Sequence, residues 1–237
     1  MPRRPPRSRR LATAARWPLG VGLTSWRYMW RTTPTRRSEA PGTPAEHRPP
    51  EFPPEVDKDE IQRIDDGVGP IFHRRYRAQV RGSELTPREL VSCLGRDPNV
   101  ASPTAFAHFQ KVRGDEEELR PGDEYVIRMP GPWDGPVRVM EVTPTSFRLA
   151  TLDGHLEAGQ IHFTAESRGE ELLFSIESWA RSADRLSDLL YDRVRMAKEI
   201  QFHMWTSFLE RIVAISGGRR ASCFEICTHR VNHGAEQ

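Results

Sequence analysis

Short segments of alternating apolar and polar residues dominate the middle of this 237-residue chain. In residues 161–165, and again in 172–176, every second residue is apolar, and Arg168-Gly169-Glu170 separates the two segments. Alternation with a period of two predicts strands with one buried face, and a short break containing Gly predicts a hairpin. Similar apolar segments bounded by turn residues predict further strands at 71–80, 105–112, 125–127, 137–142 and 147–152.

Two other segments have the spacing of helices. Thr86-Pro87-Arg88-Glu89 combines a capping-box spacing with Pro at the first helical position, so a short helix is predicted over 87–94. Further on, apolar residues recur at three-, four- or seven-residue spacings with charged residues opposite, until Gly217 and Gly218. This pattern predicts an amphipathic helix of roughly eight turns over 184–216. Its apolar stripe consists of Leu186, Leu190, Ala197, Ile200, Met204, Phe208 and Ile212, widened by Leu189, Trp205 and Leu209.

The order of these elements predicts the fold class. A strand, a short helix, six further strands and a long helix follow one another with short turns between the strands. A sheet with one apolar face has to be covered by another element, and only helix 184–216 is long enough. We therefore predict an α+β fold in which a curved antiparallel sheet of about seven strands wraps on a long C-terminal helix.

Composition divides the chain into parts. Residues 1–50 contain eleven Arg, no Lys, two acidic residues and nine Pro, a local charge of +9; since the whole chain carries +2, the remainder carries −7. We predict a basic tail rich in Arg and Trp over 1–37, with a short amphipathic helix in it. Residues 38–56, rich in Pro, are predicted to form an extended linker. The folded domain is predicted over 57–218 and a flexible C-terminal tail over 219–237.

The basic tail carries Trp and Arg together on one predicted helical face. Trp beside Arg is typical of segments that lie at an anionic membrane surface, so residues 8–37 are expected to bind there. The alternatives are that this helix docks on its own domain or on a partner, or that it is unordered. Nucleic acid is disfavoured as a partner because the acidic body offers no supporting groove. The residues concerned are Leu19, Leu23, Trp26 and Trp30, with Arg16, Arg27 and Arg31 around them.

The sequence also bears on the compartment. No stretch approaches the ~18 consecutive apolar residues of a membrane-spanning helix. The three cysteines are an odd number and give no disulfide framework of the kind found in small secreted domains. We therefore expect a cytoplasmic protein, peripheral at the membrane if the tail binds there.

One motif resembles a known family. Residues 151–163 read Thr-Leu-Asp-Gly-His-Leu-Glu-Ala-Gly-Gln-Ile-His-Phe. They resemble the signature Thr-Leu-Pro-Gly-His-Pro-Glu-Ser-Gly-Glu of an uncharacterised bacterial and plant family, domain of unknown function nineteen-ninety. The matching residues are Thr151, Leu152, Gly154, His155, Glu157 and Gly159. The departures are Asp153, Leu156, Ala158 and Gln160, and the loss of a carboxylate at Gln160 weakens any proposal of acid–base catalysis here.

That family is similar to the helix-grip superfamily of START and Bet v-like (SRPBCC) proteins, and the resemblance covers about residues 72–212. It implies a fold that agrees with the order of elements derived above. Members of the superfamily commonly hold an apolar ligand between sheet and helix, although enzymes and ligandless interaction modules also occur. The fold alone therefore does not decide the function.

Several residues are candidates for a site. His155, flanked by Asp153 and Glu157, could act as a general base or contact a ligand; the interpretation we favour is that its ring stabilises a turn by bonding to backbone. Cys223, Cys227, His229 and His233 have metal-compatible chemistry, but their spacing matches no common zinc site, so no metal is predicted. The residues expected to contact a ligand, or else to form the core, are His155, Glu157, Phe163, Phe174, Met204, Trp205 and Phe208, with Met140, Phe147 and Trp179 also available.

The body contains no Gly-rich phosphate loop, no His-Glu-x-x-His and no Gly-x-Ser-x-Gly. Our first hypothesis is therefore a module without a cofactor or catalytic residues that binds a small apolar or amphipathic molecule between sheet and helix. An enzyme that acts through His155 on a bound substrate is the second. A membrane-surface adaptor that acts through its Arg-rich tail is the third.

Overall fold

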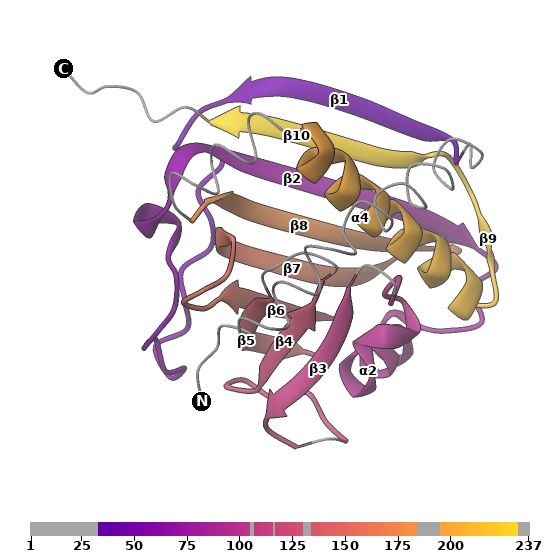
Figure 1. The fold of residues 1–237 in the computed structure, drawn as a ribbon. Helices are drawn as coiled ribbons and strands as arrows, with labels where there is room; N and C mark the ends of the chain where they lie inside the picture. The colour runs from indigo at the N-terminus through magenta and orange to yellow at the C-terminus, as the bar shows by residue number, and fades with distance from the viewer. Residues whose placement is uncertain (1–32, 105–106, 116, 130–133, 184–194, 232–237) are drawn as a thin grey trace, which may run out of the picture.

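The structure, a computed structural model, describes residues 33–104, 107–115, 117–129, 134–183 and 195–231. Ten strands form one sheet among these residues, in the order β1-β10-β2-β8-β7-β6-β5-β4-β3, with β9 paired to β2 (Figure 1). Neighbours are antiparallel except β1 and β10, which run parallel. The strands are β1 Thr35–Gly42, β2 Val68–Arg81, β3 His108–Arg113, β4 Glu124–Arg128, β5 Gly135–Thr143, β6 Ser146–Thr151, β7 Glu157–Arg168, β8 Glu171–Ser182, β9 Arg219–Arg220 and β10 Phe224–Val231.

In the described residues, two α-helices lie on the same face of the sheet, which we call the inner face (Figure 1). Helix α2, Pro87–Arg96, begins with the predicted capping box: the Thr86 hydroxyl accepts the Glu89 N–H, and the Glu89 carboxylate accepts the Thr86 N–H. Helix α4, Arg195–Ile215, crosses the sheet. The described residues also include two short 3₁₀ turns, Ile64–Asp66 and Pro98–Val100. The predicted segment 184–194 lies outside the described residues.

The main core lies between the inner face and the two helices. From α4 it receives Phe202, Trp205, Phe208, Leu209 and Ile212, and from α2 it receives Leu90, Val91 and Leu94. The strands contribute alternate residues, such as Val139 of β5 and Phe163 of β7. The α+β class, with a curved sheet held on a C-terminal helix, is thus confirmed.

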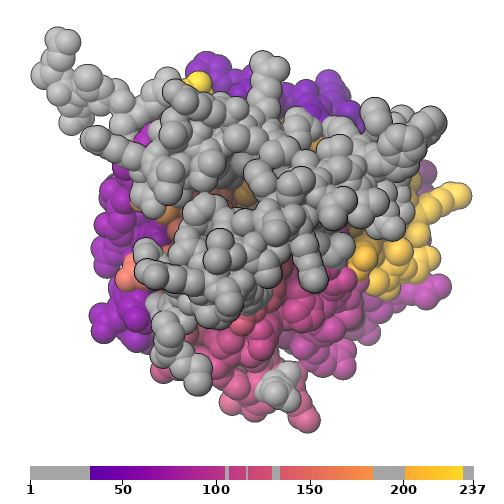
Figure 2. All heavy atoms as spheres, viewed as in Figure 1, coloured from indigo at the N-terminus to yellow at the C-terminus, as the bar shows by residue number. Residues whose placement is uncertain are grey.

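In the space-filling view of the same face, pink and magenta atoms of α2, β3 and their neighbours form the lower part (Figure 2). Yellow atoms of the C-terminal part of the chain form the right side of this view. No helix in the described part of the chain is long and apolar enough to cross a membrane.

A second, smaller core lies on the opposite, outer face. It joins Met140, Ala150 and Leu152 of the sheet to Phe52, Val56 and Ile61, which precede the sheet. Backbone contacts fix this N-terminal segment: Gln160 Nε2 donates to Pro50 O at 2.8 Å, and Gln62 N donates to Thr151 O at 2.9 Å. Residues 50–62 therefore cover the part of the outer face around β5 and β6.

The structure departs from the predicted boundaries at both ends. The sheet has ten strands instead of about seven, because β1, β9 and β10 lie outside the predicted strands. β1 lies in the predicted tail and linker, and most of its residues are exposed. Backbone pairing to β10 holds β1 in place, so the sequence of β1 has no apolar alternation by which a strand could be recognised. β10 lies in the predicted flexible tail, although Phe224 and Ile226 belong to the main core. Part of the predicted linker 38–56 packs on the sheet because its few apolar residues, Phe52 and Val56, meet the outer face.

Candidate functional site

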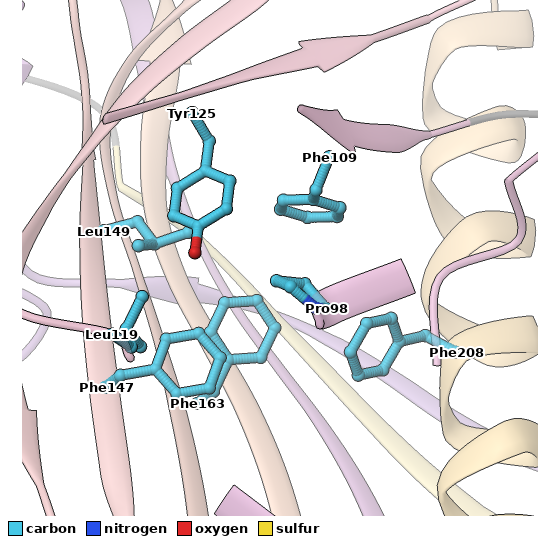
Figure 3. A pocket seen from close by; sticks show the side chains of 8 residues that line it. All are labelled: Pro98, Phe109, Leu119, Tyr125, Phe147, Leu149, Phe163 and Phe208. Atoms are coloured by element: carbon cyan, nitrogen blue, oxygen red, sulfur yellow. The ribbon is translucent and has the colours of Figure 1, made fainter. Parts of the chain in front are cut away.

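An apolar cavity lies between the inner face and α4. Its volume is about 10 Å³, which is the room of about one water molecule. Figure 3 shows Phe208 of α4 facing Phe147 and Phe163 of the sheet across it. Tyr125 brings the single hydroxyl among the lining side chains, and burial raises its pKa, so this group stays protonated. The cavity is lined by Pro98, Phe109, Leu119, Tyr125, Phe147, Leu149, Phe163 and Phe208.

A larger cleft of about 840 Å³ opens to solvent beside this cavity. It is bounded by α2, by residues 117–119 and by the turn between β5 and β6 at 142–144. Leu119 lines both the cleft and the cavity, so the two hollows meet at this residue. A Cβ atom added to Gly95 of α2 would lie 3.2 Å from Leu119 Cβ, so the missing side chain lets Leu119 approach α2.

The residues predicted to contact a ligand are brought together only in part. Phe163 and Phe208 line the cavity. Trp205 packs against both, with ring centroids 5.8 Å from each, and Phe174 stacks on Phe208 at 6.2 Å. Met204 is partly buried against the same core. Five lining residues were not predicted, because they come from loops and strands far apart in the sequence: Pro98, Phe109, Leu119, Tyr125 and Leu149.

The motif at 151–159 builds a tight reversal between β6 and β7. His155 N donates to Leu152 O at 3.0 Å, and Gly154 has a φ of 93° at the position where such a turn requires glycine. The Thr151 hydroxyl accepts the Gly159 N–H at 2.9 Å and so closes the base of the reversal. At Gly159, φ is 155° and a Cβ atom would lie 2.0 Å from Trp179 O. Backbone geometry therefore accounts for both glycines.

His155 is engaged within its own turn. Its Nδ1 accepts the Glu157 N–H at 2.9 Å, and Nε2 lies against Gly135. Burial lowers the pKa of His155, and the Glu157 carboxylate opposes this without reversing it. His155 lines neither hollow, and this geometry is the one expected of a structural turn.

The Glu157 side chain connects the motif to the helix. Its carboxylate accepts a bond from Gln201 Nε2 of α4 at 3.2 Å, and Gln201 Oε1 accepts a bond from Arg74 NH1 at 2.8 Å. Strand β7, helix α4 and strand β2 therefore meet in one polar contact on the inner face.

A second group of titratable side chains lies on the outer face. Here Nδ1 of His47 lies 2.8 Å from Nδ1 of His73, whose Nε2 bonds to Glu177 at 2.7 Å. Burial raises the pKa of Glu177, but the bonds from His73 and Arg75 outweigh this and lower it to about 2. The sequence analysis missed this group because its members lie on segments far apart in the chain.

The C-terminal Cys and His residues extend this outer-face group. Cys227 Sγ lies 3.1 Å from Nε2 of His229, and the His229 ring stacks on His47 with centroids 4.2 Å apart. Cys223 is exposed, and His233 lies outside the described residues. Within the described ranges, no group of three or more His, Cys, Asp or Glu is arranged to hold a metal ion. The predicted membrane-contact residues Arg16, Trp26, Arg27, Trp30 and Arg31 also lie outside the described residues.

The lowered pKa values of two histidines predict how the free energy of unfolding depends on pH. Burial lowers the pKa of His155, and burial together with His229 and His73 lowers the pKa of His47. Because the folded state binds these protons less readily than the unfolded state, the free energy of unfolding should fall as the pH drops below about 6.5.

Urea denaturation at about pH 7.5 and pH 5 measures this effect. His155→Ala should cost about 1 kcal/mol at the higher pH, as losing one hydrogen bond does, and should make the loss at low pH smaller. His108→Ala, at an exposed position of β3, serves as the control. Equal pH dependence in His155→Ala and the parent protein would contradict the structural role.

Several solved structures resemble this chain at low sequence identity, whereas no curated protein matches it. Norcoclaurine synthase from Thalictrum flavum is 11% identical, with a TM-score of 0.45 over 64% of this chain and 90% of that one. Major latex-like protein 151 from Panax ginseng is 14% identical, with a TM-score of 0.44 over 61% of this chain and 97% of that one. A conserved protein from Geobacillus kaustophilus is 12% identical, with a TM-score of 0.44 over 62% and 98%.

The family comparison is more specific. The model described as "Domain of unknown function (DUF1990)" matches residues 104–211. The match covers the motif at 151–159, the strands from β3 to β8 and most of α4. The resemblance inferred from that motif is thereby confirmed, and over residues 104–211 this chain is similar to the family described as Domain of unknown function (DUF1990).

Proposed function

We propose that the chain binds a small, mainly apolar molecule between the inner face of its sheet and α4. The observation that carries this proposal is the position of Leu119, which lines both an open cleft of about 840 Å³ and the apolar cavity. The ligand enters by the cleft and displaces Leu119 to reach the aromatic side chains inside.

The size of the cavity sets a condition on this binding. A void of about 10 Å³ cannot hold an organic molecule, so the wall has to yield when the ligand binds. Leu119 lies on the connection between β3 and β4 and is only partly buried. Moving it disturbs fewer contacts than moving Phe163 or Phe208, which are each 1% exposed.

The proposed binding is not catalytic. His155, the candidate base, uses its Nδ1 within its own turn and lies outside both hollows. An apolar lining with one buried hydroxyl favours burial of hydrocarbon surface over acid–base chemistry.

Replacing Leu119 by alanine tests the proposal. Removing this side chain should join cavity and cleft and strengthen binding of the fluorescent probe anilinonaphthalene sulfonate by up to about fiftyfold, since three fewer side-chain carbons, each worth about 0.8 kcal/mol, need to be displaced. Probe fluorescence with the purified full chain measures the affinity, and native mass spectrometry reports the stoichiometry. Val112→Ala, on an exposed position of β3, is the matched control. Equal affinity of the parent protein and both variants would refute the proposal.

A further inference from the structure

Beside the aromatic part of the inner face lies a group of buried polar side chains. Arg74 of β2 is 5% exposed and bonds to Gln201, which also bonds to Glu157. Tyr76 lies two residues further along β2 and faces Trp205, with ring centroids 6.5 Å apart. Burial, opposed by Arg74 and reinforced by Glu157, raises the pKa of Tyr76 to about 12, so its hydroxyl stays neutral.

Two buried polar atoms at this place lack a protein partner. Trp205 is 6% exposed and Ser178 is 5% exposed. No hydrogen-bond partner in the described part of the chain reaches Trp205 Nε1 or Ser178 Oγ. Buried donors are normally satisfied, so each one left over points to a group that completes it.

The register places both atoms on the same stretch of the inner face. Trp205 follows Gln201 by four residues, so the two share one face of α4. Ser178 of β8 lies directly opposite Arg74 of β2, and Ile176, two residues before it, lies opposite Tyr76. Ser178 therefore lies beside Arg74, and Trp205 lies one helical turn along α4 from Gln201, beside Tyr76. Trp205 also packs against Phe163 and Phe208, which line the cavity.

We propose that Trp205 Nε1 and Ser178 Oγ form a polar subsite for a carbonyl oxygen of the ligand. This inference rests on the proposed function and adds the chemical class: an uncharged ketone, ester or amide on an otherwise apolar molecule. An indole N–H can only donate, so its partner has to be an acceptor. The group is uncharged because the Glu157 carboxylate already supplies a negative charge here: it bonds to Gln201, as the Arg74 guanidinium does. A second buried anion would have to share Arg74 with Glu157.

Nuclear magnetic resonance with the ¹⁵N-labelled full chain tests the subsite. The probes are α-tetralone and tetralin, which differ by one carbonyl group. We expect α-tetralone to bind about fivefold more tightly, the worth of one net hydrogen bond. We also expect the indole Nε1–H resonance of Trp205 to move downfield with the ketone and not with the hydrocarbon.

Substitutions separate the subsite from the cavity. Trp205→Phe removes the donor while it keeps an aromatic ring, and it should bring the ratio of the two affinities close to one. Ser178→Ala, a smaller change, should reduce the ratio too. Trp179→Phe is the matched control, because Trp179 is equally buried but stacks on His73 at the outer face; its ratio should equal that of the parent protein.

The outcomes distinguish this inference from the function on which it rests. Equal affinity for the two probes, or a preference for the ketone that persists in Trp205→Phe and Ser178→Ala, overturns the carbonyl subsite. Neither result contradicts tighter probe binding by Leu119→Ala. A bound water that keeps its contact with the Trp205 indole at saturating ketone also overturns it. Failure of both probes to bind the parent protein and Leu119→Ala alike refutes the proposed function itself.

Discussion

Replacing Arg138 by methionine should lower the free energy of unfolding by about 3–5 kcal/mol, the usual cost of removing one partner of a buried ion pair. Arg138 is 1% exposed, and its Nε and NH2 donate to Glu124 Oε1 at 3.1 and 2.7 Å. Its NH1 donates to the carbonyl oxygens of Asp57 and Asp59 at 2.8 and 2.9 Å. The substitution therefore leaves a buried carboxylate without this cation and also frees the N-terminal segment on the outer face.

Denaturation by urea, followed by circular dichroism, measures the loss. The control is Arg81→Met, because Arg81 forms an exposed ion pair with Glu171 at 2.7 Å, and such pairs contribute about 1 kcal/mol or less. The double variant Arg138→Met/Glu124→Leu should recover part of the stability because it removes the buried charge as well. A loss for Arg138→Met no larger than that for Arg81→Met would contradict this role.

Phe208→Ala should destabilise the protein by about 3–5 kcal/mol, as truncating a buried phenylalanine does. Phe208 is 1% exposed, and its ring contacts Phe163, Phe174 and Trp205. Because these neighbours come from two strands and from its own helix, the core cannot close fully around the space left behind.

The same substitution should enlarge the apolar cavity, which should then bind benzene, as engineered apolar cavities of sufficient size do. Thermal unfolding with and without benzene measures both effects: the variant should unfold at a lower temperature than the parent protein and regain part of the difference with benzene. Val112→Ala, at a side chain that is 49% exposed, is the control for both measurements. A variant that loses stability but gains nothing from benzene would show that α4 collapses onto the sheet.

Much of the fold could be predicted from local patterns. The alternation in 161–165 and 172–176 corresponds to β7 and β8, and the box at Thr86 and Glu89 begins α2. Both patterns are local. The alternation that marks a strand with one buried face, and the capping residues that mark the start of a helix, involve only residues close together in the chain. The α+β class follows from them, since the predicted sheet has only one long helix to cover it.

The edges of the sheet could not be predicted in this way. β1 is held by parallel pairing with β10, a contact between residues about 190 positions apart. Most of its side chains are exposed, so backbone hydrogen bonds hold it without leaving an apolar pattern. The segment 50–62 covers the outer face with isolated apolar residues among prolines and charges, which has no period to detect.

The candidate site, like the fold, could be predicted from the sequence only in part. Apolar spacing alone marked Phe163 and Phe208 as facing the interior between sheet and helix, and the motif containing Gly154 and Gly159 indicated a backbone-determined reversal. Only the tertiary structure placed Leu119 on both cleft and cavity, and only it showed Trp205 Nε1 and Ser178 Oγ buried without a partner among the described residues. The reason is physical: local sequence determines which face of an element is apolar, whereas a cavity and an unsatisfied donor depend on how side chains from distant segments fill the space between those faces.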